Sequence, residues 1–444
     1  MTVDPGDRVV HNIVIGASKK NNDKYGYSDV VVLNDLKLRF SVVFYTIPLF
    51  FLLLKSFFYI VFLPKLALEI KYFGLLFGRF AVASAYRDFE AYQKRSKFKL
   101  SFLKSILRCW LYYHKVKPVM PEISAAFIDH GCYEKGILFE MLSAQGKPIY
   151  HIDYPYGLVR VESSQRLLYE DALQVKRRSL TEDALEKGRF YLRSVVQGKS
   201  KIPYLTVDYD DFNRESKFDY VIYTHSFTDA QLLYGSDGAF ENLLDWLDFT
   251  VKQLSGKKVC IKAHPGVYNN KVTSQVCGWD REIFENYVGS LNKNNITVID
   301  YPVNNIDFLE GLNKDAILIS HHGNALLEAA FLGFKCISSC SVNWREFDLF
   351  NDWCGRRQYV ELLEKSYDDL LGTDMDELYL YYFSLVEHSG SYFSKNHWQK
   401  TISSMAKIPL SDVIDTPYSF DDLDESIVGK IRDAVEGDLQ LVSL

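Results

Sequence analysis

The 444-residue chain lacks a broad basic field, and it lacks the short motifs of several common enzyme classes. Its formal net charge of −6 leaves no excess of cations to neutralise phosphates, so we expect no nucleic-acid partner. The patterns GxGxxG after a first strand, GxxxxGK followed by Ser or Thr, HExxH and GxSxG are all missing. These absences argue against dinucleotide-binding, P-loop, zinc-peptidase and serine-hydrolase chemistry.

Cysteine is scarce and shows no paired pattern. Seven cysteines occur, and none forms a CxxC pair or a Cys/His cluster with the spacing of zinc ligands, so we expect no metal. An odd number without a framework predicts reduced, mostly buried thiols, as in a cytosolic protein. The seven are Cys109, Cys132, Cys260, Cys277, Cys336, Cys340 and Cys354.

The beginning of the chain lacks the pattern of a cleavable signal, because about forty mostly polar residues come first. The apolar run at residues 42–63 is about long enough to cross a bilayer, but Lys55 near its middle is costly in lipid. Residues 65–104 then alternate apolar residues with Lys and Arg, as an interfacial helix does. Three arrangements stay open: a helix or hairpin on the cytoplasmic face of a membrane, which the basic pattern favours, a buried helix pair, and a spanning segment.

Composition and length predict a globular chain with two lobes. Hydrophobic residues make up 48% and charged residues 24%, as in folded proteins. One hydrophobic core rarely serves more than about 300 residues. From residue 121 onward strands and helices alternate. This predicts an α/β fold of two Rossmann-like, doubly wound lobes with a cleft between them, preceded by a helical, membrane-associated segment.

The expected elements set the domain boundaries. Strand 125–129, helix 134–145 and strand 148–152 form a βαβ unit, and later strands are expected at 220–223, 258–262, 297–299, 316–320 and 335–338. We assign residues 1–40 to a lead-in with one strand at 30–33, and residues 41–117 to a hydrophobic and basic helical segment. The acceptor-side lobe follows at 118–205 and the nucleotide-binding lobe at 206–385. Residues 386–444 are expected to form a helical tail. An interdomain linker is expected at 198–217, where Gly198, Pro203 and an acidic run occur.

The sequence IKAHPG occupies residues 261–266. It begins at the end of the strand expected at 258–262 and continues into the turn that follows. Ligands of open α/β sheets bind at the carboxyl ends of strands. There Lys262 and His264 both offer hydrogen-bond donors to a phosphate, and Pro265 with Gly266 turns the chain sharply. The alternative is an ordinary turn after a buried strand.

The sequence SHHGN follows another strand and begins a helix. The first turn of a helix presents unpaired N–H groups and a positive dipole end, which together hold anions. Asn324 is placed to cap this helix, and Glu328 lies one turn later, where its carboxylate meets a ribose. The alternative is a plain cap with a solvated Glu328. His321 and His322 are neighbours on a turn and point apart, so metal binding is not expected.

Acidic residues follow other strands. Asp229, in HSFTD, is placed to face the cleft as nucleophile or general base, or else simply lies near a helix start. In the first lobe, charged residues at two strand ends mark an acceptor-side wall, of which Glu162 is the candidate general acid or base; each is otherwise a surface charge. They are Asp129, His130, Asp153, Arg160 and Glu162.

The order of HSFTD, IKAHPG and ISHHGNALLEAAFLG resembles the nucleotide-binding lobe of GT-B glycosyltransferases that build bacterial surface polysaccharides. It is most similar to the retaining β-Kdo transferases of capsule and O-antigen assembly, and more distantly to bacterial sialyltransferases with an HP motif. The resemblance covers residues 220–339, with weaker support from 127–150.

The resemblance implies a CMP-activated donor, best CMP-Kdo, with no metal and no further cofactor. Asp229 would be the nucleophile of a double displacement, with Glu162 and His264 as the other catalytic residues. The nucleotide would contact Lys262, His264, Pro265, Ser320, His321, Gly323, Asn324 and Glu328. The acceptor would be a lipid-linked glycan at the cytoplasmic face of the bacterial inner membrane, reached by peripheral contact through 41–104.

Three alternatives remain. A sialic acid donor is less favoured, because Ser320-His321-His322 stands where sialyltransferases carry a serine pair. A CDP-glycerol-type glycerophosphotransferase would show an acidic, serine-rich turn that this chain lacks. The third is a non-catalytic polysaccharide assembly or export protein.

Overall fold

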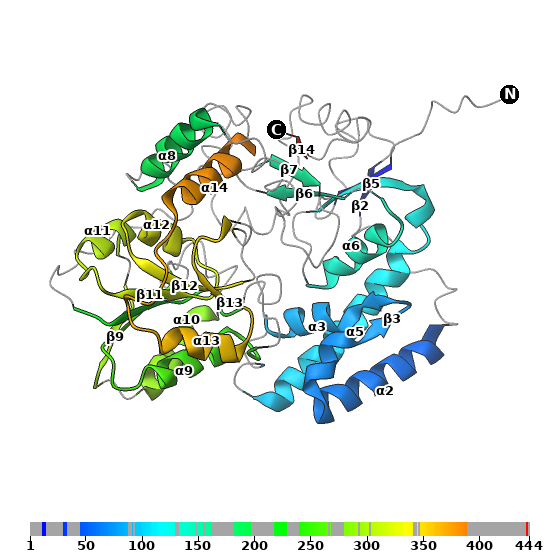
Figure 1. The fold of residues 1–444 in the computed structure, drawn as a ribbon. Coiled ribbons are helices and arrows are strands. Elements are labelled where there is room, and N and C mark those ends of the chain that lie inside the picture. Colours follow the sequence, from blue (N-terminus) through cyan, green and yellow to red (C-terminus); the bar gives the residue numbers. More distant parts are fainter. Residues whose placement is uncertain are drawn as a thin grey trace. The chain divides into compact units, whose positions relative to one another are not determined.

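The computed structural model describes residues 11–14, 30–32, 45–87, 91, 94–128, 133–147, 149–153, 157–160, 181–196, 217–228, 239–264, 267, 279–291, 294–301, 303–340, 344, 347–388 and 441–442. The chain forms two compact units, one of residues 1–172 with 387–444 and one of residues 173–386. Within the described residues each unit contains one six-stranded sheet (Figure 1). The predicted α/β class is therefore confirmed for both units.

The boundary between the units lies earlier than predicted. We expected it after residue 205, but α8 (Glu182–Val196) belongs to the second unit. A Cβ on Gly188 would collide with the carbonyl of Tyr379 in α14 (Met375–His388), so this glycine lets the two helices pack closely. The apolar face of an amphipathic helix does not indicate which of two sheets the helix covers. The sequence pattern therefore predicted the wrong unit for α8. Most of the expected linker lies outside the described residues.

The first sheet has the order β14-β7-β6-β5-β1-β2. The predicted βαβ unit is confirmed, since β5 and β6 are parallel and α6 (Gly136–Ser143) lies between them in sequence. Strands β7 and β14 are antiparallel to their neighbours. The strands are β1 (His11–Val14), β2 (Val30–Val32), β5 (Ile123–Ile128), β6 (Ile149–Asp153), β7 (Gly157–Arg160) and β14 (Leu441–Val442).

Both ends of the chain depart from the prediction. The expected lead-in supplies β1 as well as β2, and both pair in the first sheet. The expected helical tail supplies β14, which pairs with β7. These strands are two to four residues long, too short for a periodic pattern to stand out.

The predicted helical segment forms a helical part of the first unit. Nearly all of α3 (Phe77–Ala85) is buried, and it packs on α5 (Arg95–Val116). In contrast, α2 (Thr46–Phe62) buries only the side chains of Leu52, Ser56 and Ile60. The alternative prediction of a buried helix pair is therefore wrong for α2. None of the described helices has the length and apolar character needed to cross a membrane. The smaller elements are η4 (Pro64–Glu69), β3 (Lys71–Tyr72), β4 (Leu75–Leu76), η5 (Met120–Glu122) and η6 (Tyr133–Lys135).

The second sheet is parallel throughout, in the order β10-β9-β8-β11-β12-β13. This is the strand order of the Rossmann fold. Strands β8, β9 and β11 are buried at every residue, as their unbroken apolar runs predict. The strands are β8 (Tyr220–Tyr223), β9 (Val259–Lys262), β10 (Ile296–Ile299), β11 (Ile317–Ser320), β12 (Lys335–Ser339) and β13 (Asn351–Trp353). The last was not predicted, because Asn351 and Asp352 do not read as strand residues.

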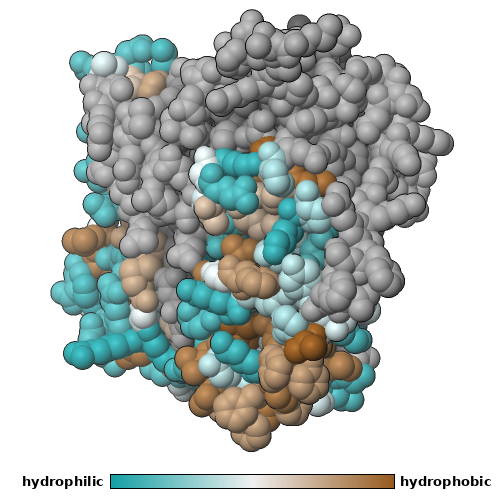
Figure 2. Space-filling view, turned by 90° about the vertical axis from the view of Figure 1, so that its right-hand side faces the viewer, coloured by the Kyte–Doolittle hydropathy of each residue, from teal (hydrophilic) through white to brown (hydrophobic). Residues whose placement is uncertain are grey.

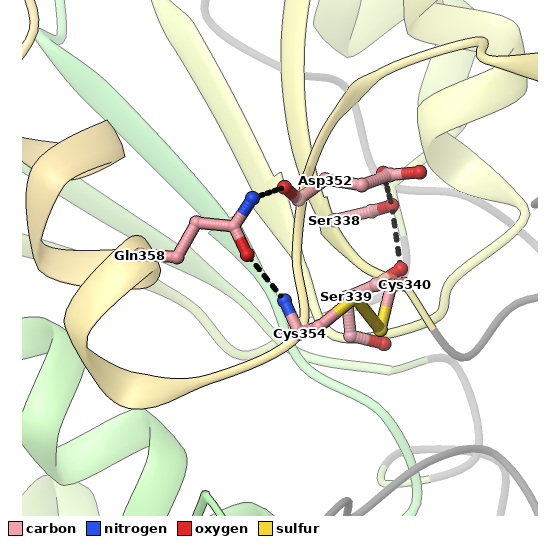
Figure 3. The surroundings of a disulfide bond; sticks show 6 residues. All are labelled: Ser338, Ser339, Cys340, Asp352, Cys354 and Gln358. Atoms are coloured by element: carbon pink, nitrogen blue, oxygen red, sulfur yellow. Dashed lines mark hydrogen bonds between the residues drawn. A yellow bond between two sulfur atoms is a disulfide. The ribbon is translucent and has the colours of Figure 1, made fainter.

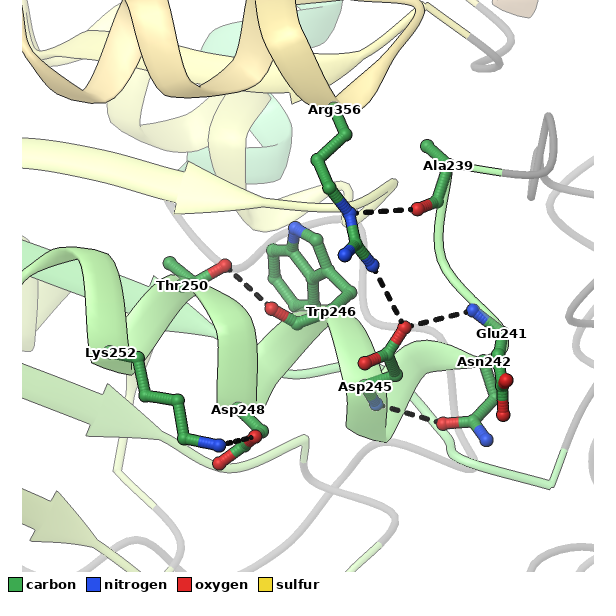
Figure 4. Close-up of polar contacts among 9 residues, drawn as sticks. All are labelled: Ala239, Glu241, Asn242, Asp245, Trp246, Asp248, Thr250, Lys252 and Arg356. Atoms are coloured by element: carbon green, nitrogen blue, oxygen red, sulfur yellow. Dashed lines mark hydrogen bonds and ion pairs between the residues drawn. The ribbon is translucent and has the colours of Figure 1, made fainter.

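Helices cover both faces of this sheet (Figure 1). On one face lie α9 (Leu243–Gln253), α10 (Asp280–Ser290) and α13 (Arg356–Leu363); on the other lie α11 (Asn305–Glu310) and α12 (Ala325–Phe331). Arg356 joins α13 to α9, since its guanidinium donates to the Asp245 carboxylate and to the Ala239 carbonyl (Figure 4). Deeper in, Thr250 and Tyr359 share a hydrogen bond of 2.7 Å.

A disulfide joins Cys340 to Cys354 (Figure 3), which contradicts the prediction of reduced thiols for this pair. The two residues directly follow β12 and β13, and parallel pairing brings their Cα atoms to 5.2 Å. The Cys340 N–H donates to the Trp353 carbonyl, which continues the ladder to the bridge. The sequence missed the bridge because it missed β13. By contrast, Cys109, Cys260 and Cys336 are buried free thiols, as predicted.

Candidate functional site

The candidate site lies at the carboxyl ends of the central strands of the second sheet. From β8 the chain moves outward through β9 and β10, then returns to the other side of β8 through β11. The direction of winding therefore reverses between β8 and β11, and ligands of open α/β sheets bind at such a point. The two segments that leave these strands are residues 224–228 and 321–324.

Histidines from three strands meet here. The ring of His225, after β8, lies 4.0 Å from the ring of His322, after β11, centroid to centroid. The same ring lies 5.2 Å from the ring of His264, after β9. The sequence motifs that contain these residues are thus brought together, as their positions at strand ends predicted. The motif HSFTD contains His225, but the sequence alone predicts no role for it, because a histidine just after a strand is common in loops.

Hydroxyl groups tie the three strand ends to one another. The Thr224 hydroxyl accepts a hydrogen bond of 2.9 Å from the His264 N–H, which links the exits of β8 and β9. The Ser320 hydroxyl donates to the Tyr223 carbonyl at 3.2 Å and accepts from the Gly323 N–H at 3.1 Å. Ser320 and Gly323, predicted as phosphate contacts, therefore brace the turn through each other. Their contact with phosphate stays a prediction.

Burial keeps His264, His321 and His322 neutral at physiological pH, because it lowers the pKa of each. Burial, followed by the positive charges of His225 and Lys262, lowers the pKa of His264 to about 3. Burial also lowers the pKa of His321 to about 3 and the pKa of His322 well below its usual value. A neutral imidazole offers one N–H donor and one acceptor. His264, His321 and His322 thus offer hydrogen-bond donors without carrying positive charge.

His321 contacts the cluster through His322 and also packs on two tryptophans, so the expectation that the two neighbouring histidines point apart is wrong. Its ring makes edge contacts with Trp246 and Trp353, at 5.6 and 5.3 Å between centroids. It shares a hydrogen bond of 2.9 Å with His322 through the two Nδ1 atoms. His321 is 2% exposed, so it positions the His322 ring from within the core. Within the described residues no group of histidine, cysteine or acidic side chains forms a metal site.

Lys262 and Glu328, predicted as phosphate and ribose contacts, lie in one buried polar cluster. The Lys262 ammonium lies over the rings of Tyr223 and Phe308, 5.6 and 5.7 Å from their centroids. Burial lowers the pKa of Lys262 to about 8, and the negative charge of Glu328 opposes this shift. Burial raises the pKa of Glu328, whose carboxylate accepts a hydrogen bond of 2.6 Å from the Asn305 amide.

Asn324 occupies the N-cap position of α12, as predicted, but its side chain makes no capping hydrogen bond. Its backbone angles, φ −58° and ψ −19°, are helical, whereas a capping side chain needs an extended N-cap residue. Instead the Leu326 and Leu327 N–H groups bond to the Gly323 and Asn324 carbonyls. The predicted side-chain cap is therefore wrong.

Asp280, which the sequence did not single out, fixes the end of the segment that follows β8. Its carboxylate accepts hydrogen bonds from the backbone N–H and the hydroxyl of Thr228. Asp280 is fully buried at the start of α10. An aspartate in a first helical turn is so common that only the tertiary contact distinguishes this one.

Several predicted site residues lie outside the described residues, so their places stay predictions. They are Asp129, His130, Glu162, Asp229, Pro265 and Gly266. Asp153 and Arg160 lie in β6 and β7, and the structure describes only their backbone.

No protein-family model matches the chain, and no curated protein matches it. Among solved structures the chain is similar to Thermosulfurimonas dismutans KpsC, a β-Kdo 2,4 transferase, with a TM-score of 0.35 and 12% identity over 59% of this chain and 79% of that one. It is also similar to Methanocaldococcus jannaschii UDP-GlcNAc 2-epimerase, in complex with UDP-GlcNAc and UDP, with a TM-score of 0.27 and 10% identity over 61% of this chain and 79% of that one.

Proposed function

We propose that the second unit binds the nucleotide of an activated sugar and that the protein is a glycosyltransferase. One observation carries this proposal: the neighbouring rings of His225, His264 and His322 at the point where the winding of a Rossmann-type sheet reverses. Nucleotides bind to folds of this kind at that point. A concentration of neutral donors there suits a phosphate more than an apolar ligand.

The electrostatics of the cluster supports an anionic ligand. A phosphate that approaches neutral imidazoles favours their charged form and so raises their pKa. The same phosphate would raise the pKa of Lys262 above about 8, so binding takes up protons near that pH and forms a charge-assisted hydrogen bond. Lys262, with its pKa of about 8, adds a cation that is already largely charged at neutral pH. In sugar transfer, such groups stabilise the negative charge that develops on the leaving nucleotide.

The order of the three motifs supports a finer proposal, a CMP-Kdo donor and a retaining double displacement. In it the carboxylate of Asp229 attacks the anomeric carbon and the bond to CMP breaks. The acceptor hydroxyl then displaces Asp229, and its proton passes to Glu162. The acceptor in this proposal is a bacterial surface polysaccharide on a lipid carrier, at the cytoplasmic face of the inner membrane.

Thermal unfolding with a panel of nucleotides tests the nucleotide site, because a ligand that binds the native state raises the unfolding temperature. We expect CMP to stabilise the protein, and to do so more at pH 6 than at pH 8 because binding takes up protons. His322→Ala and Lys262→Met should weaken binding at least about tenfold, which corresponds to one lost polar contact to a charged group. Stabilisation by none of CMP, CDP and UDP would exclude the proposal.

A buried histidine outside the site provides the control. His114 in α5 is also buried, and its Nε2 lies 3.0 Å from the Tyr72 hydroxyl. His114→Ala should lower stability and leave nucleotide affinity unchanged. Equal losses of affinity in His114→Ala and His322→Ala would show a general effect of unfolding instead.

Product mass tests the reaction itself. With CMP-Kdo and an acceptor glycan we expect the mass of one added Kdo, and Asp229→Asn should abolish transfer but retain CMP binding. A phosphodiester product from CDP-glycerol would replace glycosyl transfer with glycerophosphate transfer. Full activity in Asp229→Asn would remove Asp229 from the mechanism.

A further inference from the structure

Helix α2 is apolar on nearly every side, yet the protein covers only a narrow stripe of it. Leu52, Ser56 and Ile60, spaced four residues apart, are buried, and the helix packs on α5. Around this stripe, large apolar side chains are 50–69% exposed, namely Ile47, Phe50, Phe51, Leu54, Phe57 and Phe62. A helix that is apolar all round belongs in apolar surroundings, and these six side chains have none in the described first unit.

The exposed surface continues beyond α2. Leu63 and Leu66 extend it at one end, and Phe73 extends it at the other. Phe73 is 60% exposed at the tip of the β3–β4 hairpin with φ of 49°, where glycine or asparagine is usual. The Lys117 ammonium lies 5.0 Å from the Phe73 ring centroid and 5.4 Å from that of Tyr45, so the tip adjoins the start of α2. We call the exposed apolar side chains of α2, together with Leu63, Leu66 and Phe73, the α2 surface. Apolar side chains gather at the lower end of the view in Figure 2.

Positive charge surrounds the α2 surface. Residues 45–117 contain thirteen lysines and arginines but three acidic residues, in a chain whose net charge is −6. Lys55, Lys65, Lys71 and Lys117 are all exposed on the elements that form the surface or border it. Basic residues thus far outnumber acidic ones in the segment that carries the exposed apolar side chains of α2.

We propose that the α2 surface docks on an anionic lipid bilayer, with α2 lying in the plane of the interface. Apolar side chains that enter the headgroup boundary and lysines that meet anionic headgroups bind such a surface together. Lys55, near the middle of α2, fits a helix in this plane, because its long side chain reaches the headgroups. The charge disfavours a second copy of the chain, since two α2 surfaces would repel each other.

Flotation of the full-length protein with lipid vesicles tests the proposal, which does not depend on the proposed function. We expect binding to vesicles that contain phosphatidylglycerol, weak binding to pure phosphatidylcholine, and a decline as salt rises. The variant Phe50→Ser/Leu54→Ser removes two exposed side chains on one helical face. It should lower the partition coefficient at least about tenfold, because each side chain contributes more than a factor of ten when fully buried.

The matched control is Phe190→Ser/Leu371→Ser, which removes a phenylalanine and a leucine that are 66% and 73% exposed in the second unit. It should bind vesicles like the wild type, and both variants should keep the wild-type unfolding temperature. Equal binding by both variants, or no binding by the wild type, would overturn the proposal. A wild-type dimer in light scattering that becomes monomeric in Phe50→Ser/Leu54→Ser, without vesicle binding, would assign the α2 surface to a second copy instead.

Discussion

The carboxylate of Asp280 holds Thr228 by two hydrogen bonds, at 3.0 Å from its backbone N–H and at 2.9 Å from its hydroxyl. The two residues are 52 positions apart, and the contact fastens the segment after β8 to the start of α10. Thr228 directly precedes Asp229, the proposed nucleophile. We therefore expect Asp280 to act as a positioning residue in the proposed reaction.

Replacement of Asp280 should cost both stability and turnover. Asp280→Ala leaves the Thr228 N–H and hydroxyl without their acceptor, and we expect a loss of about 2–4 kcal/mol in the free energy of unfolding, measured in urea. Thr228→Val removes only the hydroxyl bond and should cost about 1 kcal/mol. In both variants kcat should fall while nucleotide affinity stays near that of the wild type.

Asp248 provides the control for Asp280. It forms an exposed i,i+4 ion pair with Lys252 on α9 (Figure 4), and such pairs contribute about 0.5 kcal/mol or less. Asp248→Ala should therefore leave stability and kcat almost unchanged. A fall in kcat in Asp248→Ala as large as in Asp280→Ala would contradict a specific positioning role.

The buried histidines should make the protein less stable in mild acid. An unfolded histidine takes up a proton near pH 6.5, whereas folded His321 does so only near its pKa of about 3. Between these values the unfolded state binds more protons, so stability falls as pH falls. From pH 7 to pH 5 this one residue should cost up to about 2 kcal/mol.

Urea unfolding at pH 7, 6 and 5 measures this dependence. His321→Gln should flatten the dependence in the second unit. His114→Gln should do so separately in the first, because burial lowers the pKa of His114 to about 4. Identical slopes in the wild type and in His321→Gln would show that His321 does not titrate as described.

The turn after β11 should show strong coupling between two substitutions. A Cβ on Gly323 would lie 2.7 Å from the Ser320 hydroxyl oxygen, so Gly323→Ala should destabilise by about 1–3 kcal/mol. Without that oxygen the nearest atom is the Ser320 Cβ at 3.6 Å, an ordinary contact. In a Ser320→Ala background, Gly323→Ala should therefore cost much less. A double-mutant cycle measures the coupling, and additive costs would contradict the contact.

The disulfide should stabilise the second unit. It closes a loop with a sequence separation of 14, for which loop entropy predicts about 3 kcal/mol. Cys354→Ser should lose that amount, and a reducing agent should lower the wild type to the same level. Because Cys340→Ser/Cys354→Ser lacks the bridge, the agent should leave its stability unchanged; a further loss there would point to another effect.

The sequence predicted the second sheet better than any other part. Strands β8, β9 and β11 are continuous apolar runs between polar turns, and burial on both faces requires such runs. Their order in the sheet also placed His264 and His322 close together. The sequence did not predict that Asp280, Trp246 or Trp353 lie beside the site, because their contacts come from packing between segments that are distant in sequence.

The first unit was harder to predict for a physical reason. Two pairings hold its sheet together across long stretches of chain, β1 with β5 and β14 with β7, and no local pattern in the sequence predicts them. Short strands at the ends of the chain carry too few residues for alternation to be visible. The disulfide was missed in the same way, since strand β13 is three residues long and begins with two polar ones.

Strand β14 has a consequence for the order in which the protein assembles. It pairs with β7 at the edge of the first sheet, although residues 173–386 of the second unit lie between them in sequence. During synthesis, at about 5–20 residues per second, β7 emerges well before its partner. The second unit can therefore fold on the ribosome while the first sheet still waits for its edge strand, and an open edge is prone to pair with other chains. We therefore expect the unpaired edge of β7 to favour aggregation in that interval.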